Sequence, residues 1–330
     1  MNLAKAFKNR GFEVVIVCLP NSLVSKKSHE IGLEVLEENF GSKLSRATSF
    51  KFLLNLKKYM QLLENVLQEN ARADLVIFQF KSEQVLYSLI NHKNWKFKVL
   101  AIEHGPVPSV FRLFPFRKLL SNFYGKCEKV FAVSSITADS VKIFNTEPHV
   151  LPPAANSNLL RIRSLWPEET SVLFAGRIIK KKGIEEFVEI AIKNPKTLFY
   201  VAGDGDLAGW VEKQAEIYTN LIFVGVVEDI STVLARSMAV VILSRESGEG
   251  RPLIALEAIQ AGRHVFVSER CNVAEFLKFE FPENVTIIKN NDVDLFEEKL
   301  ASITANRLRI SSTELPKWET ISNAIAPEKT

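Results

Sequence analysis

The sequence predicts an α/β protein with two doubly wound, parallel-sheet domains that face a cleft. Short apolar runs alternate with helical patterns along almost the whole chain, which is typical of βαβ units. With 330 residues, 47% of them hydrophobic, the chain is long enough to bury two ordinary cores. A stretch containing three prolines, at residues 149–167, separates two such cycles and is interpreted as a linker.

The first domain is expected to span residues 1–150 and the second residues 151–312. In the first, strands are expected at residues 13–18, 74–79, 97–102 and 129–133, and helices at 45–69, 113–124 and 136–144. In the second, strands at residues 171–175, 197–202, 221–224, 238–243, 264–267 and 285–288 alternate with helices. The final segment, 313–330, carries a helical pattern at 315–325 that is predicted to pack back across the domains.

Composition excludes several classes of protein. No run of about 18 apolar residues and no secretory pattern appear, so the sequence predicts a cytoplasmic protein without a membrane span. Three widely spaced cysteines indicate a reducing compartment rather than a disulfide framework. The five histidines show no metal-ligand spacing, so no metal site is expected.

Charge is distributed unequally between the two halves. Residues 1–150 hold 21 Lys and Arg against 13 Asp and Glu, and residues 151–330 hold 21 against 25. A basic half fits an anionic partner such as a membrane surface, or else a solvated basic face, which charge alone favours. Residues 108–126 mix aromatic and basic side chains and leave the same two interpretations open, peripheral association at the inner face of the membrane or a packed helix with a solvated basic edge. No nucleic-acid motif accompanies the charge, so no nucleic-acid partner is expected.

Two carboxylates eight positions apart, Glu249 and Glu257, flank a predicted helix start. Pro252 suits the first helical turn, and Gly262 lies where the helix is expected to end. Free backbone N–H groups at a helix start attract phosphate, while carboxylates accept hydrogen bonds from hydroxyl groups. A ligand with phosphate beside sugar hydroxyls, such as a nucleotide sugar, meets both demands.

A basic turn follows the first predicted strand of the second domain. Gly176 and Arg177 follow the strand directly, and Lys182 and Gly183 precede the next helix. Arg offers a fork that matches phosphate oxygens and Lys a mobile point charge, so together they can neutralise a departing diphosphate. Taken alone, such a turn is more often solvated surface.

As a set, these motifs resemble the retaining family-4 glycosyltransferases of the GT-B fold, which have two Rossmann-like domains. The resemblance covers residues 170–280, and residues 3–14, 103–105 and 130–135 are similar to the family's N-terminal domain more weakly. The motifs that carry it are Phe174-Ala-Gly-Arg177, Lys182-Gly183, Val201-Ala-Gly-Asp-Gly205, Phe223-Val-Gly225, Ser244, Glu249-Gly-Arg-Pro252, Leu256-Glu257-Ala and Ala261-Gly262.

The resemblance implies a role for each matching residue. Arg177 and Lys182 would hold the diphosphate of the donor, with Gly176 and the backbone of Gly250, Arg251, Pro252 and Leu253 completing the phosphate cradle. Glu257 would bind the ribose hydroxyls, and Glu249 would contact the transferred sugar and stabilise its oxocarbenium charge. His104, which follows a predicted strand, would lie near the sugar, although a plain loop histidine is an equal interpretation. This chemistry needs no metal and no further cofactor.

Three features need a separate interpretation. Gly203-Asp204-Gly205-Asp206 lacks the third glycine of a dinucleotide fingerprint, so its glycines are taken to allow close backbone approach beside the ligand. The family's opening strand and glycine turn have no counterpart before Leu3, so the first domain is predicted to lack an inner strand. Residues 153–156 differ from the family's usual linker, and His264 stands where proline is common.

The resemblance implies a retaining sugar transferase that acts on a glycan or lipid-linked acceptor, in the setting of bacterial surface polysaccharide. A sugar-nucleotide epimerase of related fold would use the same donor site without an acceptor. A non-catalytic partner subunit is a further alternative, because the first domain is predicted to be incomplete.

Overall fold

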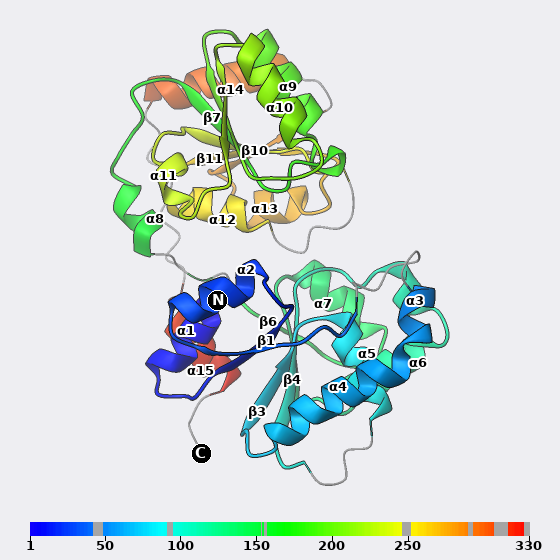
Figure 1. The fold of residues 1–330 in the computed structure, drawn as a ribbon. Helices are drawn as coiled ribbons and strands as arrows, with labels where there is room; N and C mark the ends of the chain where they lie inside the picture. The colour runs from blue at the N-terminus through cyan, green and yellow to red at the C-terminus, as the bar shows by residue number, and fades with distance from the viewer. Residues whose placement is uncertain are drawn as a thin grey trace. The chain divides into compact units, whose positions relative to one another are not determined.

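The computed structural model describes residues 1–41, 49–90, 95–152, 154, 157–245, 252–289, 293–306 and 316–326. The chain divides into two compact units (Figure 1). Unit 1 comprises Met1–Ala154 together with Pro316–Thr330, and unit 2 comprises Ala155–Leu315. Each unit has its own parallel sheet and its own buried core.

Unit 2 is a doubly wound domain with a six-stranded parallel sheet in the order β12-β11-β10-β7-β8-β9. The chain starts at the centre and builds one side before the other, so the strand order reverses between β7 and β10. Ligands of such sheets bind at this switch point, beyond the carboxyl ends of the strands. The strands are β7 (Ser171–Ala175), β8 (Leu198–Ala202), β9 (Leu221–Gly225), β10 (Ala239–Ile242), β11 (His264–Ser268) and β12 (Val285–Ile288).

Helices cover both faces of this sheet. Alternate residues of its central strands, which point to opposite faces, are therefore equally buried. In β7, Val172 and Phe174 join one core cluster, while Leu173, which points to the opposite face, is also fully buried. The helices of unit 2 are α8 (Ser157–Ile162), η2 (Lys180–Lys182), α9 (Ile184–Lys193), α10 (Ala208–Ile217), α11 (Ser231–Leu234), α12 (Leu253–Gln260), α13 (Ala274–Glu280) and α14 (Val293–Asn306).

Unit 1 contains a four-stranded parallel sheet in the order β3-β4-β5-β6 and a separate two-stranded parallel sheet, β1-β2. Its strands are β1 (Val15–Cys18), β2 (Glu34–Glu37), β3 (Leu75–Phe78), β4 (Lys98–Glu103), β5 (Lys129–Ala132) and β6 (His149–Val150). Its helices are α1 (Asn2–Asn9), α2 (Leu23–Glu30), α3 (Ser49–Leu54), α4 (Leu56–Glu69), α5 (Lys81–Leu89), η1 (Ser109–Arg112), α6 (Phe116–Tyr124), α7 (Ser135–Lys142) and α15 (Trp318–Ile325).

Strand β4 shows how the four-stranded sheet is covered on both faces. Val99 and Ala101 pack into a core that α4, α5 and α6 complete, whereas Leu100 and Ile102 pack into a second core with α1 and α15. The last helix of the chain therefore lies against the first one, with Ile321 and Ile325 both buried. Residues 316–326 thus pack within unit 1.

The structure differs from the sequence predictions at a few elements. The helix predicted at residues 45–69 is divided at Asn55, whose side-chain amide donates a hydrogen bond to the Lys51 carbonyl at the end of α3. Asn competes for backbone hydrogen bonds in this way and so interrupts helices. The stretch interpreted as a linker contains β6 and α8, and neither α2 nor β2 was anticipated.

Strands β1 and β3 belong to different sheets of unit 1. Both are apolar, yet most of their residues are only half-buried, and Val17 in β1 is 38% exposed. The sequence predicts that an inner strand is missing from this domain. The absence of such a strand stays a prediction. Among the described residues, no helix is long and apolar enough to cross a bilayer.

Candidate functional site

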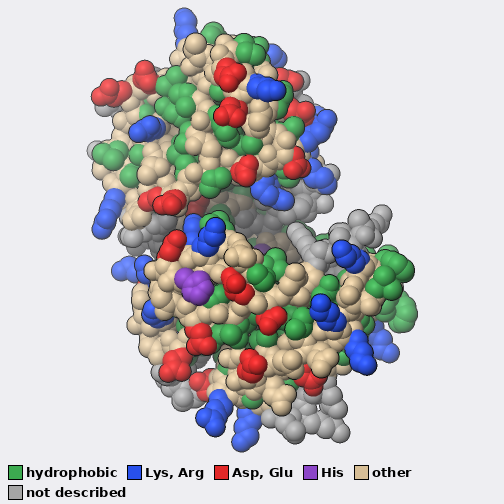
Figure 2. Space-filling model, viewed as in Figure 1, with side chains coloured by type: hydrophobic (Ala, Val, Ile, Leu, Met, Phe, Trp, Pro, Cys, Tyr) green, Lys and Arg blue, Asp and Glu red, His purple; other side chains and the backbone are tan. Residues whose placement is uncertain are grey.

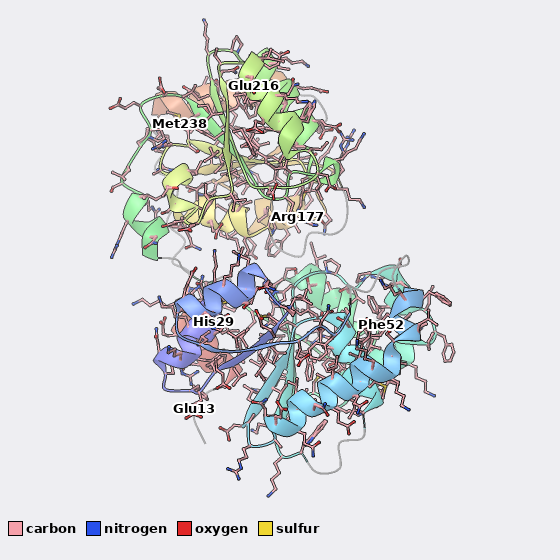
Figure 3. All side chains as sticks on the ribbon, viewed as in Figure 1. Glu13, His29, Phe52, Arg177, Glu216 and Met238 are labelled. Atoms are coloured by element: carbon pink, nitrogen blue, oxygen red, sulfur yellow. The ribbon has the colours of Figure 1, made fainter. Side chains whose placement is uncertain are left out.

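The turn after β7 carries the two cations that the sequence singles out. Arg177 is exposed and Lys182 is half-buried at the end of η2 (Figure 3). Burial lowers the pKa of the Lys182 ammonium, and the nearby charge of Arg177 lowers it further. A buried ammonium that lies beside a second positive charge gains most from a ligand that carries negative charge.

Gly183 allows this turn to lie directly against the end of β10. Its φ is +75°, and a Cβ there would stand 2.4 Å from the Cβ of Leu243 and 2.6 Å from its carbonyl oxygen. Any other residue at position 183 would push η2 away from β10. The glycine therefore places Lys182 at the switch point of the sheet, between the ends of β7 and β10.

The neighbouring turn, after β8, packs against the same segment. Gly203 has φ +139°, and a Cβ there would fall 1.9 Å from the carbonyl oxygen of Gly176. Gly205, with φ +154°, approaches the carbonyl of Ile178, whose own N–H donates to the Asp204 carbonyl at 2.8 Å. This is the close backbone approach that the sequence analysis expects of the two glycines, and it stiffens the segment that carries Arg177.

Helix α12 starts at the same edge of the sheet, because it follows the parallel strand β10. Pro252 is its N-cap, just outside the first turn, and no described side chain caps the helix. Its end is the predicted one: Gly262 has φ +71°, and the N–H groups of Gly262 and Arg263 donate to the carbonyls of Ile259 and Ala258. Among the described residues, no side chain takes up the first backbone N–H groups of α12, which are the kind of donors that bind an anion.

Glu257 lies on the second turn of α12 and is half-buried. Burial raises the pKa of its carboxyl group, and the negative charge of Asp229 raises it further. Burial also acts to raise the pKa of Asp229, but hydrogen bonds from Ser231 and from Asn158 outweigh it, so this carboxylate is held ionised. Two adjacent carboxylates with pKa values pushed apart can accept hydrogen bonds from ligand hydroxyls.

A second group of cations at this edge was missed by the sequence analysis. The Glu186 carboxylate, on α9, lies 2.8 Å from a guanidinium nitrogen of Arg245, which follows β10, and 3.5 Å from one of Arg270, which follows β11. The N–H of Arg245 also donates to the Lys181 carbonyl at 3.1 Å. Arg177, Arg245 and Arg270 each follow the carboxyl end of one of three neighbouring strands. That shared position in the sequence could have identified Arg245 and Arg270 as candidate site residues.

His104 lies in unit 1, directly after β4. Its Nε2 is 2.8 Å from Oε1 of Gln79, which follows the neighbouring strand β3. The side chain is exposed, but packing around the ring removes part of its water, and this lowers the pKa of His104. The imidazole is therefore neutral near pH 7 and can accept or donate one hydrogen bond.

A buried polar cluster fixes the end of β4 beside His104. Glu103 is 3% exposed, and its carboxylate accepts hydrogen bonds from Lys81, Gln84 and Tyr124. Lys81 also donates to the Tyr124 hydroxyl at 2.7 Å. Burial lowers the pKa of Lys81, and the Glu103 charge opposes this, as expected for a buried pair whose members compensate each other. The cluster ties α5 and α6 to the sheet.

Of the residues with predicted roles, the structure brings together Gly176, Arg177, Lys182, the start of α12 with Pro252 and Leu253, and Glu257, all in unit 2. Leu253 is 68% exposed at the helix start. His104 belongs to unit 1. Three predicted residues, Glu249, Gly250 and Arg251, lie outside the described residues.

The two halves of the chain match two families of known proteins. Residues 1–158 match the family described as Glycosyltransferase Family 4, and residues 158–317 match Glycosyl transferases group 1. An uncharacterized glycosyltransferase of Methanocaldococcus jannaschii, MJ1607, is 26% identical over 180 residues. That match covers 48% of this chain and 46% of the relative, so the chain spans about half the relative's length.

Solved structures share the fold over nearly the whole chain. HepE of Anabaena, solved in complex with UDP, has a TM-score of 0.71 at 13% identity, covering 98% of this chain and 89% of that one. Sucrose-phosphate synthase of Thermosynechococcus elongatus has a TM-score of 0.69 at 17% identity, covering 98% and 90%. Since the two family matches together span residues 1–317, this chain carries two glycosyltransferase domains in succession, and its fold is GT-B.

Proposed function

We propose that this glycosyltransferase takes a hexose or related sugar from a uridine diphosphate sugar and transfers it, with retention of configuration, to a glycan or lipid-linked acceptor. The observation that carries the donor class is the pair Arg177 and Lys182 at the switch point of the unit 2 sheet, beside the start of α12, which no described side chain caps. Uridine is chosen because HepE, a structure of the same fold, is also solved with UDP-glucose.

In the proposed site, the diphosphate lies between the two cations and the first N–H groups of α12. Glu257 and Asp229 then accept hydrogen bonds from hydroxyls of the nucleoside, for which their ionised oxygens are suited. The two cations thus bind the diphosphate of the ligand, and the two acids bind its nucleoside. A nucleotide sugar carries both kinds of group, anionic phosphates and sugar hydroxyls.

The proposed reaction breaks the bond between the anomeric carbon and the diphosphate oxygen and forms one to the acceptor oxygen on the same face. The bonding electrons leave with the diphosphate, which gains negative charge that Arg177 and Lys182 stabilise. The acceptor proton passes to the departing phosphate. Glu249, outside the described residues, and His104 keep their predicted roles beside the sugar, and no metal is required for these steps.

Calorimetry with UDP and with GDP tests the donor site. UDP is expected to bind to the wild-type protein, and Lys182→Gln and Arg177→Gln are each expected to weaken binding about 10- to 100-fold, because each removes a charged hydrogen bond. Lys193→Gln, an exposed change at the end of α9, is the matched control. Equal affinity of Lys182→Gln and Lys193→Gln for UDP would contradict the proposed site.

Product analysis tests the reaction. The protein with a UDP-hexose and a pool of bacterial surface glycans is expected to form an α-linked product from an α-linked donor, with or without EDTA. An epimerised sugar nucleotide formed without any acceptor would identify an isomerase instead. Donor binding without turnover on any acceptor would support a non-catalytic subunit.

A further inference from the structure

Gln79 and His104 lie at the same edge and on the same face of the four-stranded sheet of unit 1. Each is the first residue after one of two neighbouring parallel strands, β3 and β4. Side chains alternate between the faces of a strand, so Gln79 continues the row of Ile77, and His104 continues the row of Ile102. Ile77 and Ile102 both pack into the core with α1 and α15. The topology therefore brings a carboxamide and an imidazole together at the carboxyl edge of this sheet.

The backbone that carries this pair is held in place on both strands. Residues 79–80 form the whole connection between β3 and α5. Lys81, the first residue of α5, and Tyr124 both donate hydrogen bonds to the Glu103 carboxylate, which is buried directly before His104. The short connection and the end of β4 are thus tied to each other, and rotation of the two side chains is the main freedom that is left to the pair.

The contact between the two side chains selects which ring nitrogen of His104 carries the hydrogen. Nε2 of His104 lies 2.8 Å from Oε1 of Gln79. A carboxamide oxygen can only accept a hydrogen bond, so Nε2 is the nitrogen that donates. Burial lowers the pKa of His104, so the imidazole is neutral and Nδ1 keeps a lone pair. No residue that the structure describes forms a hydrogen bond with Nδ1.

We propose that Gln79 is a positioning residue that holds His104 as its Nε2–H tautomer, so that Nδ1 accepts a hydrogen bond from a hydroxyl of the transferred sugar. The inference rests on the proposed function, which puts His104 beside that sugar. The opposite orientation of the carboxamide, with its NH2 group toward Nε2, would put the hydrogen on Nδ1 and reverse the direction of this bond.

The tautomer matters because the sugar becomes positively charged as its bond to the diphosphate breaks. A lone pair directed at the sugar stabilises this developing charge, whereas an N–H group carries partial positive charge and opposes it. The interaction is therefore stronger in the transition state than in the bound donor. Loss of Gln79 should lower kcat more than it raises the KM for the donor.

Nitrogen-15 NMR of the imidazole rings tests the tautomer directly. In long-range proton–nitrogen spectra of the full chain at pH 8, the His104 signals are those that His104→Gln removes. Nε2 is expected to be protonated and Nδ1 unprotonated in the wild type. Gln79→Leu offers no acceptor and should give a mixture of tautomers, and Gln79→Glu offers acceptor oxygens alone and should restore Nε2–H. A hydrogen on Nδ1 in the wild type, or an unchanged tautomer in Gln79→Leu, would overturn the proposal.

Titration with the donor tests the contact with the sugar. UDP-glucose is expected to shift the Nδ1 signal of His104, because a hydroxyl of the hexose donates to this nitrogen. UDP lacks the hexose and is expected to leave the signal in place. Equal shifts with the two ligands, or no shift with bound UDP-glucose, would contradict the sugar contact.

Steady-state kinetics measure the consequence for turnover. With UDP-glucose and a pool of bacterial surface glycans, Gln79→Leu should lower kcat about 5-fold and change the KM for UDP-glucose by less than about two-fold, as expected when one neutral hydrogen bond is lost. Gln79→Glu should recover most of kcat, because it keeps the acceptor oxygen.

Gln68→Leu is the matched control, since Gln68 is an exposed glutamine of α4. Helix α4 lies along the front of unit 1 (Figure 1), where acidic, basic and hydrophobic side chains are interspersed (Figure 2). Substitutions on such solvated surface have small effects, so kcat should stay within about two-fold of the wild type.

The outcomes separate this inference from the proposed function. A protein that neither binds nor turns over UDP-glucose contradicts the proposed function, and the ring spectra of the wild type and Gln79→Leu still decide the tautomer. Turnover by the wild type with an unchanged kcat in Gln79→Leu overturns the positioning role alone. Circular dichroism of each variant separates a local effect from misfolding, since Gln79 is exposed.

Discussion

Glu257 and Lys182 are both half-buried ionisable groups whose pKa values are shifted toward their neutral forms by burial. Each lies beside a group of its own sign, Asp229 for Glu257 and Arg177 for Lys182. Ionisable groups with pKa values perturbed in this way gather at functional sites. At the scale of single residues, this arrangement is the strongest indication that the edge of unit 2 binds a ligand.

The raised pKa of Glu257 leads to a pH-dependent affinity for UDP. The ionised carboxylate accepts hydrogen bonds from both ribose hydroxyls in the proposed site, and protonation removes part of that capacity. Because burial and Asp229 raise the pKa, the loss begins closer to neutral pH than for an ordinary glutamate. Calorimetry should show UDP affinity falling from pH 7 to pH 5. Glu257→Gln should bind about 10-fold more weakly at pH 7 and show a flatter profile; parallel profiles would contradict the assignment.

His264 makes unit 2 sensitive to acid. It is 1% exposed, and burial lowers the pKa of its imidazole to about 3. Its pKa in the unfolded chain is 6.5, so the unfolded state binds a proton that the folded state does not as pH falls below 6.5. The free energy of unfolding should therefore fall by about 2 kcal/mol between pH 7.5 and pH 5 through this residue alone. Urea titrations should show a shallower pH dependence for His264→Gln.

At the scale of elements, the turns after β7 and β8 form one rigid support for the proposed phosphate site. Ile178 exchanges backbone hydrogen bonds with this second turn, donating to Asp204 and accepting from Leu207. Gly176 donates in the same way to Ala202, at 3.0 Å. Such backbone ladders position side chains more accurately than a free loop can. Arg177 is carried by this support although its own side chain is exposed.

Gly203→Ala should disrupt this support. The new Cβ would fall 1.9 Å from the Gly176 carbonyl oxygen, at a φ of +139° that alanine rarely adopts. We expect a loss of about 3 kcal/mol or more in the free energy of unfolding, together with weaker UDP binding. Gly209→Ala is the control, because a Cβ at Gly209 meets no atom within 4 Å. Thermal unfolding of both variants, with and without UDP, measures the difference.

Strands and helices that stand out in the sequence by their pattern of apolar residues were predictable. Elements and contacts that depend on packing between distant segments were not. β7 and β12 lie where the apolar runs predict them, because buried parallel strands are continuous apolar segments. β2 escaped prediction, since it is a short, half-exposed strand with a glutamate at each end, and it pairs with β1 in a separate two-stranded sheet. At the site, motif spacing indicated Arg177 and Lys182, whereas Glu186 joins Arg245 to Arg270 from positions 59 and 84 residues away in sequence, a contact that only the fold creates.

At the scale of the whole molecule, unit 1 is discontinuous in sequence. Residues 316–326 return to it after all of unit 2, and α15 supplies Ile321 and Ile325 to the core formed with α1 and β4. Arg10 fastens this return, because its guanidinium donates to the Ala326 carbonyl at 2.7 Å and to the Ser322 hydroxyl at 3.3 Å. The stability of the first unit therefore depends on the end of the described chain.

Ile321→Ala should destabilise unit 1 and leave unit 2 folded. Removing a 3% exposed isoleucine leaves a cavity and should cost about 2–5 kcal/mol. In limited proteolysis, cleavage is expected to appear first within residues 1–154, while a fragment of unit 2 persists and still binds UDP. Asn323→Ala, at an exposed position of α15, should behave as wild type. Simultaneous loss of both units would show that they unfold cooperatively.

The return of α15 also sets an order on synthesis. A ribosome releases every described strand of unit 2 before it releases residues 316–326, so unit 2 can complete its core while one face of the β4 sheet still lacks α15. During that interval Leu100 and Ile102 lack the cover of Ile321 and Ile325, and α1 is the one described helix in that core. Unit 1 therefore completes its core after unit 2, although its first residues leave the ribosome before any residue of unit 2.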